Sequence, residues 1–190
     1  MQHLVTPKAT KNEPFAWWEG AFTAEELDWL QGKVKEATQE SLVGDGSVNT
    51  EIRRSETNWL SNDKDTLWVF EKLNDVVSSL NADHFRFNLL GFSEKLQLTN
   101  YHENKQGMYG WHQDFGGSAC RKLSVSIQLS HSSEYEGGNL EIFNSVKPAT
   151  MGRQRGLITV FPAWTVHQVT PVVKGTRQSL VTWVSGEPFR

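Results

Sequence analysis

The chain has 190 residues, a formal net charge of −3 and 37% hydrophobic residues, a composition typical of a globular protein with one domain. The slightly acidic balance argues against a dedicated nucleic-acid-binding protein, because such domains are usually basic. Cys120 is the only cysteine, so no internal disulfide can form. Residues 1–14 lack an apolar signal core, and no run is long and apolar enough to span a membrane. We therefore expect a cytoplasmic protein with neither nucleic-acid nor membrane partners.

The first part of the chain, up to about residue 84, is predicted to be a helical support. Residues 15–22 are expected to form an edge strand or a packed turn. Thr23 and Glu26 have the capping-box spacing, which predicts a helix running to about Gln39. An extended segment is expected over 52–60, and residues 62–65 open a second helix. Its apolar face would contain Leu67, Phe70, Leu73, Val76, Val77 and Leu80.

From about residue 85 to residue 190 the hydrophobic pattern has a period of two, which predicts β-strands. The candidate strands are 85–89, 96–101, 108–114, 122–130, 139–143, 157–161, 166–170 and 178–185. About eight short strands separated by turn residues favour a sandwich or jelly roll over βαβ units.

The strand over 122–130 alternates almost without exception. Its apolar positions are Leu123, Val125, Ile127 and Leu129, and its small polar positions are Ser124, Ser126 and Gln128. If the helices cover the apolar face, the polar face would line an interior pocket; otherwise the polar face meets solvent. The pattern alone leaves both arrangements open.

Three side chains have the pattern of a metal site. His112 and Asp114 are two positions apart, so on an extended strand they face the same way. His167, on another predicted strand, can supply a third ligand. Two imidazoles and one carboxylate are the ligand set of non-haem Fe(II) oxygenases, in which the remaining metal positions stay open.

Arg177 follows His167 by ten positions and extends this pattern. The open metal positions can accept the carboxylate and keto oxygens of a 2-oxo acid, together with O2. A guanidinium pairs with the far carboxylate of 2-oxoglutarate in a bidentate manner and keeps its charge. Ser179, Val181 and Trp183 share the face of Arg177 on the predicted strand, so Trp183 is either a pocket wall or part of the core.

The segment from Tyr101 to Trp183 resembles the catalytic core of the Fe(II)/2-oxoglutarate dioxygenases, and most closely the branch similar to prolyl-4-hydroxylases. The residues that carry the resemblance are Tyr101, Tyr109, Trp111-His112-x-Asp114, Leu129, Gly137-Gly138-Asn139-Leu140-Glu141-Ile142-Phe143, Phe161-Pro162, His167-x-Val169-x-Pro171 and Arg177-x-Ser179-Leu180-x-x-Trp183. Residues 22–27 also resemble the way these enzymes begin.

The resemblance implies a double-stranded β-helix, a distorted jelly roll, with the N-terminal helices on the outer face of one sheet. It also implies His112, Asp114 and His167 as the catalytic iron ligands and Arg177 as the 2-oxoglutarate anchor. Cosubstrate contacts are implied for Tyr101 and for the position of Gln128, where some relatives have a tyrosine. Tyr109, Trp111 and Trp183 are expected to line the substrate site.

The resulting hypothesis is a single dioxygenase domain over 1–190 that uses Fe(II), 2-oxoglutarate and O2, with ascorbate as a reductant, to hydroxylate an unactivated C–H bond. The substrate suggested by the resemblance is a prolyl residue in a peptide or protein. A free amino acid or another small molecule is an alternative. Two alternatives from other classes are a cupin-like hydrolase or isomerase with Zn or Mn, and a non-catalytic jelly-roll binding module. The loop 44–49 is a candidate lid over the substrate.

Overall fold

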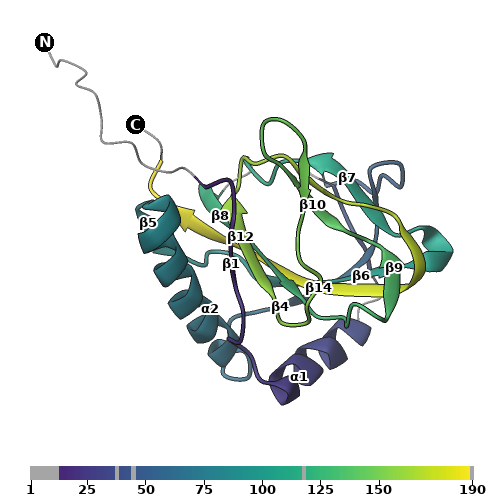
Figure 1. Cartoon of the computed structure of the whole chain (residues 1–190). Helices are drawn as coiled ribbons and strands as arrows, with labels where there is room; N and C mark the ends of the chain where they lie inside the picture. The colour runs from purple at the N-terminus through teal and green to yellow at the C-terminus, as the bar shows by residue number, and fades with distance from the viewer. Residues whose placement is uncertain (1–12, 37–38, 44–45, 117–118, 189–190) are drawn as a thin grey trace, which may run out of the picture.

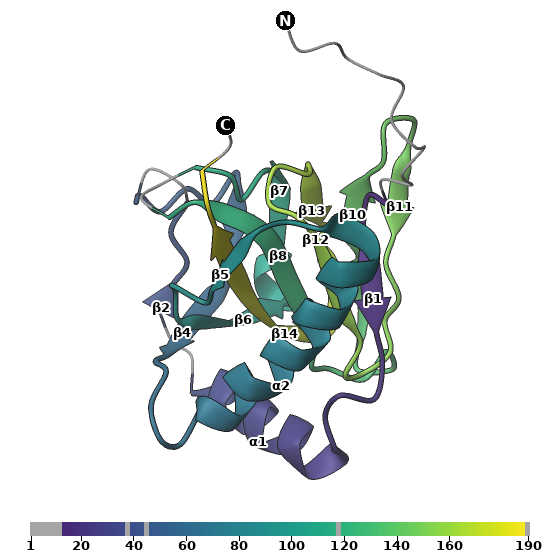
Figure 2. The same ribbon diagram turned by 90° about the vertical axis from the view of Figure 1, so that its left-hand side faces the viewer.

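The computed structural model describes residues 13–36, 39–43, 46–116 and 119–188, and it is dominated by two β-sheets that face each other. Two helices, α1 (Ala24–Lys35) and α2 (Leu67–Leu80), lie against the outer side of the larger sheet (Figures 1 and 2). Short turns of helix, η1 (Asn81–Phe85) and η2 (Glu103–Lys105), follow α2 and β6. None of the helices in the described ranges is long and apolar enough to cross a membrane.

Among the described residues, the larger sheet has nine strands and the smaller sheet has five, and all the recorded strand pairs are antiparallel. The larger sheet runs in the order β1 (Ala16–Trp18), β12 (Ile158–Pro162), β8 (Arg121–Gln128), β14 (Val172–Gly186), β6 (Leu96–His102), β4 (Glu56–Leu60) and β2 (Gln39–Glu40), with β5 (Leu89–Gly91) and β9 (Tyr135–Gly137) also paired to β14. The smaller sheet runs in the order β11 (Pro148–Thr150), β10 (Leu140–Phe143), β13 (His167–Val169), β7 (Met108–His112) and β3 (Arg53–Arg54).

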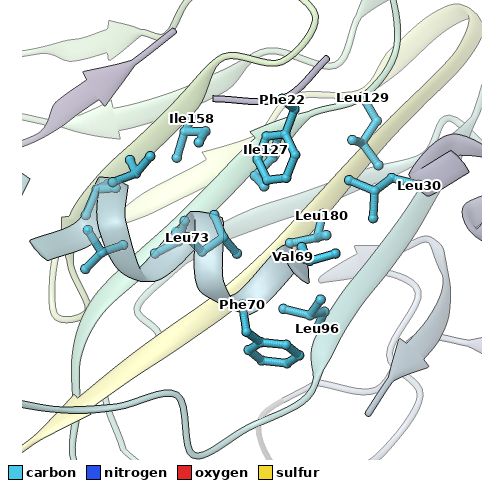
Figure 3. Close-up of a cluster of buried hydrophobic side chains, with 14 of the residues drawn as sticks. Phe22, Leu30, Val69, Phe70, Leu73, Leu96, Ile127, Leu129, Ile158 and Leu180 are labelled. Atoms are coloured by element: carbon cyan, nitrogen blue, oxygen red, sulfur yellow. The ribbon is translucent and has the colours of Figure 1, made fainter. Parts of the chain in front are cut away.

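The main hydrophobic core lies between the larger sheet and the two helices (Figure 3). Leu30 and Val34 of α1 and Leu73 of α2 are fully buried there. The sheet contributes the apolar positions of β8 predicted above, together with residues of β6, β12 and β14. Because neighbouring residues of a strand point to opposite faces, Ser124 and Ser126 of β8 face the space between the sheets. The first of the two arrangements left open by the sequence is therefore the correct one.

Helix α1 begins as predicted and ends earlier. The N–H of Thr23 donates to the Glu26 carboxylate at 2.8 Å, and the N–H of Glu26 donates to the Thr23 hydroxyl at 3.3 Å, so both bonds of the capping box are present. The helix stops at Lys35, however, and Gln39 already belongs to β2, where it pairs with Thr57 of β4.

The buried face of helix α2 differs from the prediction at one position. It starts at Leu67, after a turn in which the Leu67 N–H donates to Asp63 O. Leu67 itself is 45% exposed, and Val69 is buried in its place. The other five predicted apolar positions are buried.

The predicted strand over 85–89 is wrong. The chain leaves α2 through η1, and Arg86 adopts a left-handed conformation with a φ of 58°. The Asn81 side chain accepts a hydrogen bond from the Phe87 N–H and donates one to Phe87 O, both at 2.9 Å. These bonds close a turn, and the strand begins only at Leu89.

The N-terminal region also contributes more strands than the prediction of a helical support implied. β1 forms an edge of the larger sheet, as anticipated for residues 15–22. β2 and β4 extend the other edge of that sheet, and β3 joins the smaller sheet beside β7. The chain before residue 85 therefore supplies part of both sheets and, through β3, a wall of the central cavity.

Candidate active site

Three side chains that can bind a metal meet at one end of the smaller sheet. His112 is the last residue of β7, and His167 is the first residue of β13. The antiparallel register places the two histidines directly opposite each other. β7 ends before Asp114, so this residue is not on a strand as predicted. Its backbone N–H donates to Ala163 O at 2.9 Å instead, and this bond holds it beside the histidines.

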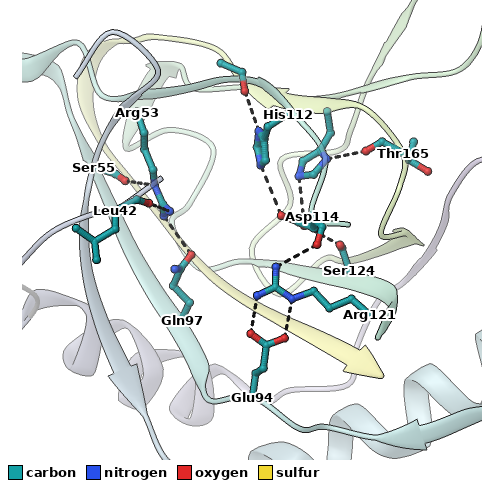
Figure 4. A network of polar contacts seen from close by, with 12 residues as sticks. Leu42, Arg53, Ser55, Glu94, Gln97, His112, Asp114, Arg121, Ser124 and Thr165 are labelled. Atoms are coloured by element: carbon teal, nitrogen blue, oxygen red, sulfur yellow. Dashed lines mark hydrogen bonds and ion pairs between the residues drawn. The ribbon is translucent and has the colours of Figure 1, made fainter. Parts of the chain in front are cut away.

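The distances among the three side chains suit a shared cation. Nε2 of His112 lies 3.7 Å from one carboxylate oxygen of Asp114, and Nε2 of His167 lies 3.5 Å from the other. The two imidazole centres are 4.1 Å apart. One ligand atom from each residue lies within 4.8 Å of the others. Figure 4 shows the His112 ring directed at the Asp114 carboxylate.

Both imidazoles are oriented by backbone carbonyl groups. Nδ1 of His112 lies 2.8 Å from Gly110 O, and Nδ1 of His167 lies 2.9 Å from Thr165 O. Because a carbonyl oxygen only accepts, each Nδ1 must carry the hydrogen, and the lone pair of the neutral ring is then on Nε2. This arrangement is usual for histidines that bind a metal, whose second nitrogen donates to a carbonyl or carboxylate.

The electrostatics keep the histidine neutral and the carboxyl ionised. Burial, with a further contribution from the neighbouring His167, lowers the pKa of His112 from 6.5 to about 4. Burial alone would raise the pKa of Asp114, but its electrostatic interactions with His167 and His112 and the hydrogen bond from Ser124 lower it below its ordinary value. A neutral imidazole and an ionised carboxylate are the forms that bind a cation.

Asp114 is held in place by a second group of side chains, which donate hydrogen bonds to it. Ser124 Oγ donates to a carboxylate oxygen of Asp114 at 2.7 Å, and Nη1 of Arg121 donates to Asp114 O at 3.1 Å. Glu94 binds the other side of the Arg121 guanidinium with contacts of 2.6 and 2.5 Å (Figure 4). The guanidinium carbon of Arg121 also lies 3.9 Å from the ring centre of Trp183. This network joins the candidate metal ligand to one wall of the cavity.

The three candidate ligands open into a cavity of about 430 Å³ between the two sheets. Arg177 is only 2% exposed and lines the same cavity, together with Tyr101 and Trp183. The strand register places Arg177 opposite Tyr101, with the guanidinium carbon 5.4 Å from the ring centre. The volume is in the range of pockets that bind small molecules. A cationic group and a three-ligand cluster in one cavity suit an anionic cosubstrate that also contacts the metal.

The sequence of this region matches that of a known enzyme family. Residues 96–185 match the 2OG-Fe(II) oxygenase superfamily. This match covers nearly half of the chain. The chain is similar to PKHD-type hydroxylases, with 27% identity over 173 residues to one from Prochlorococcus marinus, covering 83% of this chain and 78% of that relative. It is 38% identical over 79 residues to one from Synechococcus sp. strain CC9605, a match that covers 40% of this chain and 36% of that relative.

Solved structures with low sequence identity share the fold of this oxygenase. A prolyl hydroxylase from Trichoplax adhaerens, in complex with a peptide of hypoxia inducible factor, aligns with a TM-score of 0.78 at 15% identity over 91% of this chain and 84% of that chain. A prolyl-4-hydroxylase from Pseudomonas putida aligns with a TM-score of 0.72 at 17% identity over 90% of this chain and 92% of that chain.

The donor groups of the site fit the cofactors that the superfamily match implies, which are Fe(II), 2-oxoglutarate and O2. Two neutral imidazoles and one carboxylate on one side leave the other positions of Fe(II) open. Within the described ranges, the buried guanidinium of Arg177 has one hydrogen bond, from Nη1 to Ser179 Oγ at 3.3 Å. Its remaining donors are therefore available for a carboxylate.

Two of the predicted cavity residues lie elsewhere. Trp111 does not line the cavity but is 44% exposed on the opposite face of β7, where it packs against Phe143. It occupies the position next to His112, and adjacent strand residues face opposite ways. Gln128 is buried in a small adjoining pocket beside Arg177, where its amide donates to the Tyr135 hydroxyl at 2.9 Å.

Tyr109 lies inside the cavity, as predicted, and contacts two of its polar residues. Its ring is stacked on that of His112 with centres 3.5 Å apart, and the guanidinium carbon of Arg53 lies 4.6 Å from its ring centre. Burial raises the pKa of the Tyr109 hydroxyl above its ordinary value.

The candidate lid over 44–49 is described only in part. Gly46, with Leu42 and Val43, lines the cavity, while residues 44–45 of the candidate lid lie outside the described residues. The same holds for residues 117–118, although Phe115 and Gly116 just before them also line the cavity.

Sequence reasoning missed Arg53 and the pair of Glu94 and Arg121. Arg53 was noted only as part of an extended segment, and Arg121 precedes the alternating strand without any motif of its own. Arginines next to a predicted strand were the available signal, and this signal does not distinguish an arginine inside the cavity from one on the surface.

Proposed function

We propose that this oxygenase hydroxylates an unactivated C–H bond of a prolyl residue in a peptide or protein. The observation that carries the reaction type is the cluster of His112, Asp114 and His167 in the same cavity as the buried Arg177. The substrate rests on similarity: several relatives are named PKHD-type hydroxylases, and two solved structures that share the fold are prolyl hydroxylases.

In this proposal the three clustered side chains hold Fe(II). Arg177 pairs with the far carboxylate of 2-oxoglutarate, and Tyr101, which is buried beside it, supports that contact. When bound, iron and 2-oxoglutarate activate O2, so that one oxygen atom enters the substrate while 2-oxoglutarate is converted to succinate and CO2. The contribution of the protein is to place and orient these groups and to exclude water.

The architecture extends the proposal. We propose that the two facing sheets form a double-stranded β-helix, a distorted jelly roll, and that residues 1–190 act as one dioxygenase domain. The order of strands in each sheet and the helices on the outer side of the larger sheet support this interpretation.

An anaerobic binding experiment tests the assigned roles. Wild-type protein with Fe(II) and 2-oxoglutarate should show a weak visible charge-transfer band. Asp114→Ala should abolish the band, whereas Arg177→Ala should weaken binding of 2-oxoglutarate and leave iron binding intact. Wild-type protein without the band would contradict the proposed site.

Turnover tests the substrate. Succinate formation should increase when a proline-rich peptide is added, and hydroxyproline should appear in equal amount. Turnover with free proline or another small molecule, and none with any peptide, would reject the peptide assignment and retain the reaction type.

A further inference from the structure

A second buried arginine, Arg53, lines the cavity on the side opposite the larger sheet. It lies on β3, which pairs with β7 at the edge of the smaller sheet. The residue is only 6% exposed, and Figure 4 shows its side chain extending toward Gln97 across the space between the sheets. Its guanidinium brings a positive charge into the cavity.

Every hydrogen-bond partner of Arg53 in the described ranges is neutral. Nε donates to Ser55 Oγ at 2.9 Å, Nη1 to Leu42 O at 3.2 Å and Nη2 to Gln97 Oε1 at 3.1 Å. The guanidinium carbon also lies 4.6 Å from the ring centre of Tyr109. A guanidinium has five N–H donors, so these contacts leave two of them free. A buried charge without a counter-charge is costly, which favours binding of an anion.

Comparison with the other arginines of the cavity also indicates that Arg53 binds an anion. Arg121 has its counter-charge, because Glu94 binds it at two points. Arg177 has no carboxylate partner in the described part of the chain, and its expected ligand is the far carboxylate of 2-oxoglutarate. Iron, Asp114, Arg177 and 2-oxoglutarate would together be close to neutral, and Arg53 would then remain as an uncompensated positive charge.

The position of Arg53 places its ligand close to the reaction centre. Its guanidinium carbon is 4.6 Å from the ring centre of Tyr109, which lies 3.5 Å from the ring centre of His112, so Arg53 is at most about 8 Å from the candidate iron ligand. Chain residues span at most roughly 3.5 Å each. Two to three extended residues are enough to span that distance, so an anion bound at Arg53 can belong to the same short substrate segment as the carbon that is hydroxylated.

We propose that Arg53 binds a carboxylate of the substrate, and that the enzyme prefers a substrate carrying this group within about two to three residues of the reacting carbon. The inference rests on the proposed function, because it concerns the substrate of the same site. The carboxylate comes either from an acidic side chain of a peptide or from the terminal carboxylate of a small substrate. These two sources share one chemistry and are separated by the choice of probe.

The test compares probes that differ by a single charge. Mn(II) replaces iron to prevent turnover, and saturating 2-oxoglutarate occupies Arg177, so that a carboxylate on the probe reports on another site. The peptide pair is acetyl-Gly-Pro-Glu-amide and acetyl-Gly-Pro-Gln-amide, and the small pair is N-acetylproline and N-acetylprolinamide. Binding is followed by tryptophan fluorescence, since Trp59 and Trp183 line the cavity.

The charged member of at least one pair should bind the wild-type protein on the order of thirtyfold more tightly than the neutral member. Arg53→Gln should bind the two members equally, and Arg53→Lys should retain part of the preference. Arg54→Gln is the matched control. Arg54 is the next residue of the same strand, and it points away from the cavity to donate to Gln106 O and Thr50 O.

Two outcomes overturn the inference: a wild-type protein without any preference for the charged probes, or a preference that persists in Arg53→Gln. If Arg53→Gln does not fold, the wild-type preference and Arg53→Lys decide the matter. Failure of the proposed function has another signature, since the Fe(II) enzyme would then form no succinate above background with any probe, whatever the binding data show.

Discussion

The hydrogen bond from Ser124 to Asp114 gives a sharp test of how the site is supported. Ser124 is 1% exposed, and its hydroxyl donates to a carboxylate oxygen of Asp114 at 2.7 Å. Hydrogen bonds to charged groups contribute about 1.5–3 kcal/mol. Because about 1.4 kcal/mol corresponds to a tenfold change in an equilibrium constant, Ser124→Ala should weaken metal binding by roughly 10- to 100-fold.

The assay is a titration of the metal-free protein with Co(II), followed by its visible absorption. Ser126→Ala is the control, since Ser126 lies two positions along the same strand, lines the same cavity and makes no recorded contact with Asp114. The control should bind Co(II) as the wild type does. Equal affinity in Ser124→Ala and wild type, or an equal loss in both variants, would show that the hydroxyl does not orient the carboxylate.

Three further predictions concern the cosubstrate, the pH dependence and the core. Arg177→Gln should weaken 2-oxoglutarate binding at least tenfold in the anaerobic titration and leave Co(II) affinity unchanged; a joint loss of both would contradict the separate roles. With a pKa of about 4 for folded His112 and about 6.5 unfolded, only the unfolded imidazole takes up a proton at pH 5, so stability falls with falling pH. The free energy of unfolding of the metal-free protein, measured in urea, should be about 2 kcal/mol lower at pH 5 than at pH 7. His112→Asn should lack that difference. The same pH dependence in His112→Asn as in the wild type would show that His112 is not its cause. Leu30→Ala should lower the free energy of unfolding, measured in urea, by about 2–5 kcal/mol, because Leu30 is fully buried. Trp17→Ala should lower it by less than about 1 kcal/mol, because Trp17 is exposed. Equal losses in the two variants would contradict the assigned core.

The features that sequence reasoning placed correctly are those set by short-range geometry. The alternation in β8 fixed which side chains face the helices, because successive residues of a strand point to opposite faces. The capping box of Thr23 and Glu26 was found because both partners lie in one turn. The clustering of the candidate ligands around His112 was anticipated because metal chemistry restricts the residue types and their spacing.

The features it misplaced depend on contacts between distant residues. Residues 85–89 alternate like a strand, but the Asn81 side chain caps them as a turn. Gln39 has no local reason to leave the first helix, and only its pairing with β4 makes it a strand residue. In each case a tertiary contact outweighed the local propensity.

The arginines show the same limit within the site. Arg53 and Arg54 are adjacent and identical in type, and one lies in the cavity while the other lies on the surface. The register of β3 against β7 decides which of them faces inward, and no feature of the segment itself encodes that register. Glu94 and Arg121 meet only after folding, so their pairing had no signal in the sequence.

Strands β8 and β14 connect the stability of the oxygenase to its chemistry. One face of each strand packs against the helices through residues such as Ile127 and Leu180, and the other presents Ser124 and Arg177 to the cavity. A shift of one residue in the register of either strand would exchange its two faces. The apolar side chains would then leave the core, and the polar side chains would leave the cavity. Burial of the apolar face therefore fixes the strand register, and this register directs Ser124 and Arg177 into the cavity. A cavity in that core, as in Leu30→Ala, should then lower stability while the folded fraction still binds Co(II) with wild-type affinity.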